Sequence, residues 1–241
     1  MRLLQALALL CLLAASALAQ ATDILVAASN DTPALQRFVD DLATRRPDDR
    51  VRFVHTSALT SPESLPADSR LVLLGADALD WRLGTPGGPP TLVMQISRVQ
   101  AFRRLGDSRP PHLTLLWSDP PPSRQLRLIR QLLPQARRVG LLYGDDSRFL
   151  VNELRRLAAA QGLAITTWYW PDTRDSRPLN RLLDGSDVLL GVDDPALYNP
   201  GTIKGVLLAS YGRRLALIGP TAAFIRAGSL IVGNCHLGMI A

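Results

Sequence analysis

Cysteine and histidine are scarce in this chain of 241 residues, which limits the sites that it can build. Cys11 lies in an N-terminal apolar run that we expect to be removed, so Cys235 is left without a partner for an intramolecular disulfide. The three histidines, His55, His112 and His236, stand far apart in the sequence. Because a metal site requires clustered His, Cys or carboxylate side chains, we predict no metal and no disulfide.

Sequence signatures of common enzymes are missing as well. There is no Gly-x-Ser-x-Gly nucleophile motif, no Walker loop, and no Gly-x-Gly-x-x-Gly after the first strand-like run. Two carboxylate pairs, Asp145-Asp146 and Asp193-Asp194, follow predicted strands and could serve an exported hydrolase. Capping of the next helix is the simpler interpretation of both pairs. We therefore predict that the protein is not an enzyme and needs no cofactor.

Lysine is nearly absent, since Lys204 is the only one, and arginine supplies almost all of the positive charge behind the net charge of +6. The arginines are scattered in pairs such as Arg45-Arg46 and Arg155-Arg156, without the interleaved aromatic side chains of a nucleic-acid stacking surface. Solvated helix faces explain this distribution, and we predict no nucleic-acid partner.

The N-terminus has the residue order of a secretory signal peptide. Met1-Arg2 supplies a positive charge, Leu3 to Leu18 is almost entirely Leu and Ala, and small residues follow in Ala17–Ala21. The apolar run is shorter than the roughly 18 residues that a membrane-spanning helix needs. We predict that residues 1–21 form a cleavable signal peptide and that the mature protein is exported to the periplasm.

The rest of the chain alternates short apolar runs with amphipathic patterns, which is typical of α/β proteins with parallel sheets. The predicted strands are 23–28, 51–55, 70–75, 91–96 and 113–117 in a first series, and 138–143, 164–170, 188–192 and 215–219 in a second. The predicted helices are 33–46, 123–133, one from Ser147 to about 161, 178–183 and 199–211. These patterns predict two Rossmann-like lobes, 22–119 and 120–230, joined by a stiff crossing at Asp119–Pro122, with an atypical tail at 231–241.

Ligands of open parallel sheets bind beyond the carboxyl ends of the strands, so we expect a cleft between the lobes that is lined by these loops. The candidate ligand-binding residues lie at or after the carboxyl ends of predicted strands, and each has a structural alternative as a cap, a turn or the edge of the core. They are Ser29, Asn30, Gly75, Ala76, Gln95, Trp117, Ser118, Tyr143, Asp193, Asp194, Tyr198 and Thr221. Trp117, Tyr143 and Tyr198 could stack on an aromatic or apolar solute, and Arg226 could pair with a carboxylate.

Several segments of the second series resemble a known family. They are Ser123–Leu126, Leu132–Pro134, Arg138–Tyr143, Asp194–Pro200, Thr202–Lys204 and Leu217–Leu230. These segments are similar to the second lobe of ABC-transporter substrate-binding proteins, related to the tryptophan/tyrosine-type binding proteins. The resemblance covers residues 120–230, and the first lobe only by its general plan. It implies a type I periplasmic-binding-protein fold with three crossings between lobes, which closes on its ligand by a hinge motion.

The resemblance also implies partners, namely a small-molecule solute, for example an amino acid, and an inner-membrane ABC permease. Ile231–Ala241 does not match the family, so we expect a C-terminal truncation near Leu230 that leaves a sheet edge exposed. Solute capture for import is the leading functional hypothesis. The alternative is a periplasmic ligand-binding sensor or accessory protein of a receptor or outer-membrane system, because one fold serves several functions.

Overall fold

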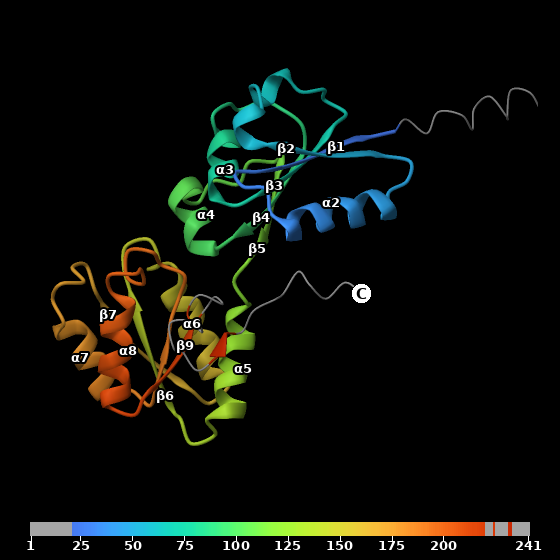
Figure 1. The fold of residues 1–241 in the computed structure, drawn as a ribbon. Helices are drawn as coiled ribbons and strands as arrows, with labels where there is room; N and C mark the ends of the chain where they lie inside the picture. Colours follow the sequence, from blue (N-terminus) through green and yellow to red (C-terminus); the bar gives the residue numbers. More distant parts are fainter. Residues whose placement is uncertain (1–20, 220–223, 225–230, 233–241) are drawn as a thin grey trace, which may run out of the picture. The chain divides into compact units, whose positions relative to one another are not determined.

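The computed structural model describes residues 21–219, Phe224 and residues 231–232, and in it the chain forms two compact units (Figure 1). The first unit runs to Met94 and includes Pro110–Leu115, and the second contains Gln95–Arg109 and everything from Leu116 onward. The predicted boundary after Asp119 therefore differs from this division, because 95–109 packs with the second unit. The predicted signal peptide lies outside the described residues, apart from Ala21.

The first unit is built on a five-stranded sheet. Its strands are β1 (Asp23–Ala28), β2 (Arg50–His55), β3 (Arg70–Leu74), β4 (Thr91–Ile96) and β5 (Leu113–Trp117), in the order β2-β1-β3-β4-β5. The strands from β1 to β4 pair in parallel. Residues Ile24–Ala28 of β1 are all buried, because helices cover both faces of such a sheet, and this produces the continuous apolar run in the sequence.

Helices α2 (Pro33–Arg45), α3 (Ala76–Leu83) and α4 (Arg98–Leu105) follow β1, β3 and β4, and two short 3-10 helices span Thr56–Ala58 and Pro62–Ser64. The Thr32 hydroxyl accepts from the Leu35 N–H and caps α2, in which Pro33 is the first residue. Helices α3 and α4 were not predicted. The side chains of Ser97 and Gln100 form a capping box at the start of α4, a signal that is visible in the sequence.

The second unit repeats the topology of the first. Its strands are β6 (Arg138–Tyr143), β7 (Ala164–Tyr169), β8 (Val188–Leu190), β9 (Ala216–Gly219) and β10 (Ile231–Val232), in the order β7-β6-β8-β9-β10. Its helices are α5 (Pro122–Leu132), α6 (Leu150–Ala159), α7 (Arg177–Asp184) and α8 (Ile203–Gly212). Helices α5 and α6 pack together on one face of the sheet, and α7 and α8 pack together on the other (Figure 1).

Strand β10 corrects one expectation about the tail. Ile231 and Val232 pair in parallel with Ile218 and Gly219 of β9, so the start of the predicted atypical segment continues the sheet instead of leaving the β9 edge open. Residues 233–241 lie outside the described residues.

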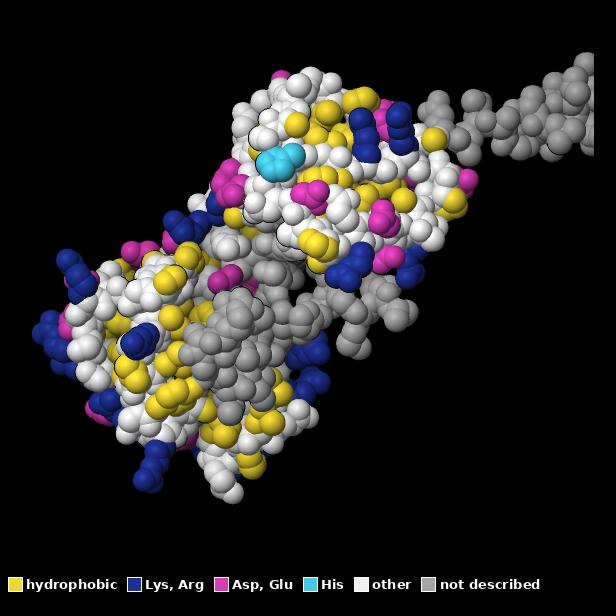
Figure 2. Space-filling view, in the orientation of Figure 1, with side chains coloured by type: hydrophobic (Ala, Val, Ile, Leu, Met, Phe, Trp, Pro, Cys, Tyr) yellow, Lys and Arg dark blue, Asp and Glu magenta, His cyan; other side chains and the backbone are white. Residues whose placement is uncertain are grey.

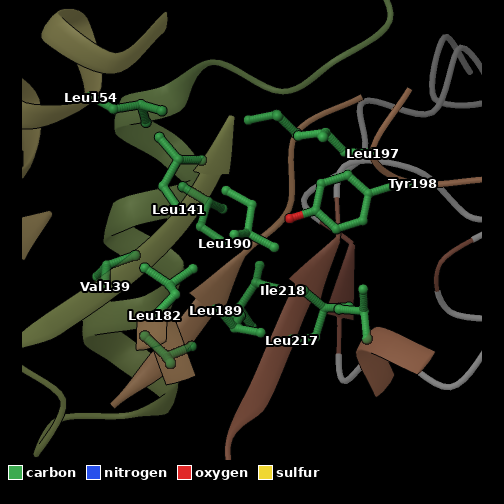
Figure 3. Packing of buried hydrophobic residues seen from close by; sticks show 14 of the residues in the cluster. Val139, Leu141, Leu154, Leu182, Leu189, Leu190, Leu197, Tyr198, Leu217 and Ile218 are labelled. Atoms are coloured by element: carbon green, nitrogen blue, oxygen red, sulfur yellow. The ribbon is translucent and has the colours of Figure 1, made fainter. Parts of the chain in front are cut away.

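The core of the second unit lies along its central strands and beneath the helices that cover them (Figure 3). Leu141, Leu189 and Ile218, from three neighbouring strands, are 1% exposed or less. Burial of each such side chain stabilises the fold by about 1.5–3 kcal/mol. Tyr198 packs in the same cluster, with its hydroxyl pointing inward among the aliphatic side chains.

Candidate functional site

The strand order creates one topological switch point at the carboxyl ends of each sheet. In the first unit the chain moves from β1 to β2 on one side and then to β3 on the other, and in the second unit it moves in the same way from β6 to β7 and β8. Connections leave the two central strands in opposite directions at such a switch point, which is where open α/β sheets bind ligands. The loops after β1, β3, β6 and β8 are therefore the candidate ligand-binding loops.

The switch point of the first unit brings four predicted residues together. Ala28 and Leu74 are paired in register at the ends of β1 and β3, so Ser29 and Asn30 emerge beside Gly75 and Ala76. Gly75 has φ = 90°, in the left-handed region that favours glycine, and α3 begins directly after it. From the first turn of this helix, Asp77 accepts a hydrogen bond from the Ser29 hydroxyl at 3.5 Å.

The switch point of the second unit has a matching bond between Ser147 and Asp194. The Ser147 hydroxyl donates to Asp194 Oδ2 at 2.5 Å and accepts from the Gly144 N–H at 3.0 Å, while Asp194 Oδ1 accepts from the Ala196 N–H at 3.0 Å. Asp194 is 1% exposed, so its carboxylate ties the loop after β6 to the loop after β8. In both units a serine that follows the first strand thus bonds an aspartate that follows the third.

Two predicted ligand-binding residues are buried in the second unit. Tyr198 is 8% exposed and packs against Phe224, with ring centroids 5.4 Å apart. Burial also raises the pKa of its hydroxyl. Asp194 and Tyr198 therefore organise the loop after β8 and do not line its surface in this structure.

An aromatic and charged cluster lies at the ends of β6 and β7. Tyr143 and Tyr169 are paired in register, with ring centroids 5.6 Å apart. Arg148 lies over both rings and forms a salt bridge to Asp145 at 3.0 Å, and the Tyr169 hydroxyl donates to the same carboxylate at 3.0 Å. The carboxylate of Asp145 raises the pKa of both Tyr169 and Arg148. The prediction that Asp145-Asp146 caps the next helix is wrong, because α6 has no side-chain cap and Asp146 pairs with Arg103 at 3.0 Å.

A second group of carboxyls surrounds the start of α4. Both carboxylate oxygens of Asp119 accept from the Arg98 N–H, at 3.0 and 3.1 Å, and the Arg98 guanidinium pairs with Glu153 at 2.6 Å. Burial raises the pKa of Asp119 to about 6. Burial also raises the pKa of Asp193, and a hydrogen bond from the Ser97 side chain opposes this shift.

A cavity of about 20 Å³ lies among these side chains, with room for about one water molecule. It is lined by Arg98, Asp119, Pro120, Pro122, Gln125, Leu150, Leu154, Val192 and Asp193. A space of this volume is too small for an organic solute.

No protein-family model matches the sequence, and no curated protein matches it either. Solved structures do match the fold. The ABC domain in complex with L-Trp from Streptococcus pneumonia aligns with a TM-score of 0.54 at 17% sequence identity, over 88% of this chain and 79% of that chain. A ligand-free, open structure of a substrate-binding protein with adhesive properties from Clostridium difficile gives 0.59 at 15% identity, over 82% and 74%. A conserved domain protein from Vibrio cholerae gives 0.53 at 15% identity, over 86% and 77%.

This chain has the fold of substrate-binding proteins. The prediction of two Rossmann-like lobes with parallel sheets is thereby confirmed. In a substrate-binding fold, the exposed residues at the carboxyl ends of the strands are the candidates for ligand contact. Of the remaining predicted residues, Gln95 is exposed with φ = 55°, an uncommon value for a residue other than glycine, and Trp117 is 41% exposed. Ser118 is half-buried and donates its N–H to the Ile96 carbonyl at 2.9 Å, and Thr221 and Arg226 lie outside the described residues.

Sequence reasoning missed Arg148 and Tyr169 as site residues. Tyr169 ends β7 beside Tyr143, and a pair of tyrosines at the ends of two predicted strands is a signal that the sequence already holds. The position of Arg148 depends on the turn that Ser147 fixes, which no local pattern predicts. Across the described residues no group of three or more His, Cys, Asp or Glu side chains could hold a metal ion. No helix in the same part of the chain is long and apolar enough to cross a membrane.

Proposed function

We propose that this protein is a periplasmic solute-binding protein that captures a small organic molecule with the loops at the carboxyl ends of its two sheets. The observation that carries the proposal is the repeated switch point, with the same strand order and a Ser–Asp bond in each unit. The fold similarity to substrate-binding proteins supports it. The L-Trp bound to the Streptococcus pneumonia domain makes an amino acid the first ligand class to test.

The roles of the carboxylates support a binding protein over an enzyme. Asp194 ties two loops together, Asp145 is bonded to Arg148 and Tyr169, and Asp119 lines a cavity with room for about one water molecule. General acid–base catalysis requires a carboxyl within hydrogen-bond reach of a substrate, and these positions favour structural roles instead.

Export and transport complete the proposal. Residues 1–21 have the order of a cleavable signal peptide, and we propose that the mature protein delivers its solute to an inner-membrane ABC permease. Co-purification from solubilised membranes tests this step. Recovery of a receptor or an outer-membrane component in place of a permease would favour the sensor or accessory role.

A thermal-shift screen of the purified protein against amino acids, small carboxylates, nucleosides and sugars tests solute binding. A solute present at 100 times its Kd should stabilise the folded protein by about 2.7 kcal/mol. We expect Asp77→Ala and Tyr143→Ala to reduce the ligand-induced shift, and the matched changes Asp68→Ala and Tyr211→Ala, at exposed positions away from the switch points, to leave it intact. A cooperative melt that no solute moves would contradict the proposal.

A further inference from the structure

Charge is unevenly divided between the two units. The second unit holds 19 Lys and Arg against 11 Asp and Glu, whereas the first holds 8 against 10. Lys and Arg side chains are spread over the visible surface of the unit that contains α6 and α7 (Figure 2). The potential of such a unit attracts anions and raises their rate of association, so the second unit favours an anionic group on the solute.

Arg148 places one of these cations at the carboxyl end of the second sheet. Its guanidinium carbon lies 4.9 Å from the ring centroid of Tyr169 and 5.9 Å from that of Tyr143. Its Nη2 donates to Asp145 Oδ1 at 3.0 Å, and the Tyr169 hydroxyl donates to the same oxygen. Two aromatic rings and one carboxylate oxygen therefore hold a side chain that would otherwise be flexible.

The held guanidinium still presents donors to solvent. A guanidinium carries five N–H donors in a planar fork, the bond to Asp145 uses one of them, and the Arg148 side chain is 60% exposed. A carboxylate matches this fork in a bidentate arrangement. Because the rings orient the group before a ligand arrives, binding loses little side-chain entropy.

The loop that carries Arg148 is fixed at the switch point. The preceding residue, Ser147, is the one whose hydroxyl bonds Asp194 and the Gly144 N–H. Arg148 is thus an exposed cation in the loop after β6, next in sequence to the serine at the switch point, where a sheet of this topology binds ligands.

We propose that Arg148 binds the carboxylate of the captured solute, so that the ligands of this protein are small carboxylic acids. The inference rests on the proposed function and adds to it a residue and a chemical class. The competing chemistry is an amine or guanidinium ligand that takes the place of Arg148 on the two rings and pairs with Asp145. The two cases predict opposite effects of removing Arg148. The affinity for an acid should fall, whereas the affinity for a cation should rise.

Calorimetric titrations with matched acids and amides test the proposal. The probes are L-tryptophan with L-tryptophanamide, L-leucine with L-leucinamide, and benzoate with benzamide, followed by the acid and the amide of any other solute that the thermal-shift screen identifies. The variants are Arg148→Ala, Arg148→Lys and a matched control, Arg181→Ala. Arg181 also stacks on an aromatic ring of β7, 5.3 Å from the centroid of Trp168, but projects from α7.

We expect the acid of the best pair to bind at least about tenfold more tightly than its amide, the size of one hydrogen bond to a charged group. Arg148→Ala should reduce the affinity for the acid by about tenfold or more and leave the affinity for the amide unchanged. Arg148→Lys should recover part of the lost affinity for the acid. Arg181→Ala should change neither affinity. Equal binding of an acid by wild type and Arg148→Ala, or tighter binding of amines by the variant, overturns the inference and leaves the proposed function standing. Failure of the wild type to bind any solute of any class overturns both.

Discussion

Asp119 is a half-buried carboxyl, and we expect its ionisation to destabilise the second unit, an effect that Asp119→Asn isolates. Burial raises its pKa from an ordinary value of 3.8 to about 6 in the folded protein. Between these two pH values the folded protein binds more protons than the unfolded chain. The free energy of unfolding therefore falls as the pH rises through this window, and the contribution of the protonated carboxyl is complete below it.

The size of the effect follows from the shift in pKa. A difference of about two pKa units corresponds to about 3 kcal/mol between the two protonation states. Asparagine removes the titration and keeps one side-chain oxygen that can accept the Arg98 N–H, which Asp119 binds at 3.0 and 3.1 Å. We expect Asp119→Asn to exceed the wild type in free energy of unfolding by up to about 3 kcal/mol at pH 8 and to match it near pH 4.

Urea unfolding followed by tryptophan fluorescence at pH 4, 6 and 8 measures this difference. Asp187→Asn is a control of opposite sign, since Arg138 lowers the pKa of Asp187 to about 2 and its ionised form therefore stabilises the fold above pH 4. After allowance for solvent screening, the free energy of unfolding of Asp187→Asn should be about 1 kcal/mol below that of the wild type at pH 8. The reasoning is refuted if Asp119→Asn gains nothing at pH 8, or if wild type and variant show the same dependence on pH between 4 and 8.

Two further predictions concern buried positions and use urea unfolding at neutral pH. Gly140→Ala in β6 should reduce the free energy of unfolding by about 1–3 kcal/mol, because the added Cβ would overlap Ser186 and press on Leu182; an unchanged midpoint would mean that α7 shifts freely. Arg82→Met should change stability by less than about 1 kcal/mol or raise it, because the buried Arg82 guanidinium has an Nη2 without a hydrogen-bond partner among the described residues. Arg82 Nε donates to the Thr91 hydroxyl at 3.0 Å, and a loss above about 3 kcal/mol would show instead that this bond is essential to the first unit.

Several strands were predictable from the sequence because they are buried on both faces and therefore read as continuous apolar runs. β1, β4, β5 and β6 match their predicted bounds. β1 and β6 are almost entirely buried, whereas β5 is half-exposed. Helix α3 is only eight residues long, and half of it is charged or aromatic, so its sequence offers no clear apolar stripe. Hydrophobic periodicity therefore does not predict short helices next to Gly-rich and Pro-rich loops.

The assignment of residues 95–109 to the second unit could not be predicted from the sequence. It depends on the stacking of Phe102 on Phe149, with centroids 4.4 Å apart, and on the pair between Arg98 and Glu153, which are 55 residues apart in the chain. No local pattern indicates which of two lobes such a segment will join. The boundary was predicted after Asp119 because three prolines follow it. In the structure Asp119 already contacts the start of α4, since it accepts the Arg98 N–H.

The candidate site was predictable in its loops and not in its side chains. The switch-point rule selects the loops after β1, β3, β6 and β8 from the order of strands alone, and they hold most of the residues that were predicted. Which side chains face solvent depends on how each turn closes. Asp193 and Asp194 are neighbours, yet one faces a water-sized cavity beside Ser97 and the other bonds Ser147.

A Ser–Asp bond occurs at the switch point of each unit, although the two units show no visible sequence repeat. Loops after the first and third strands leave a sheet of this order in opposite directions, which leaves a space for a ligand between them. A serine and an aspartate are short enough to bridge it without filling it, and Ser29–Asp77 and Ser147–Asp194 both do so. The bridge in the second unit is buried and has a short bond of 2.5 Å, whereas the bridge in the first is exposed and 3.5 Å long. The loop that carries Arg148 is therefore tied by the more buried of the two bonds, which suits the proposal that Arg148 meets a carboxylate in a fixed geometry.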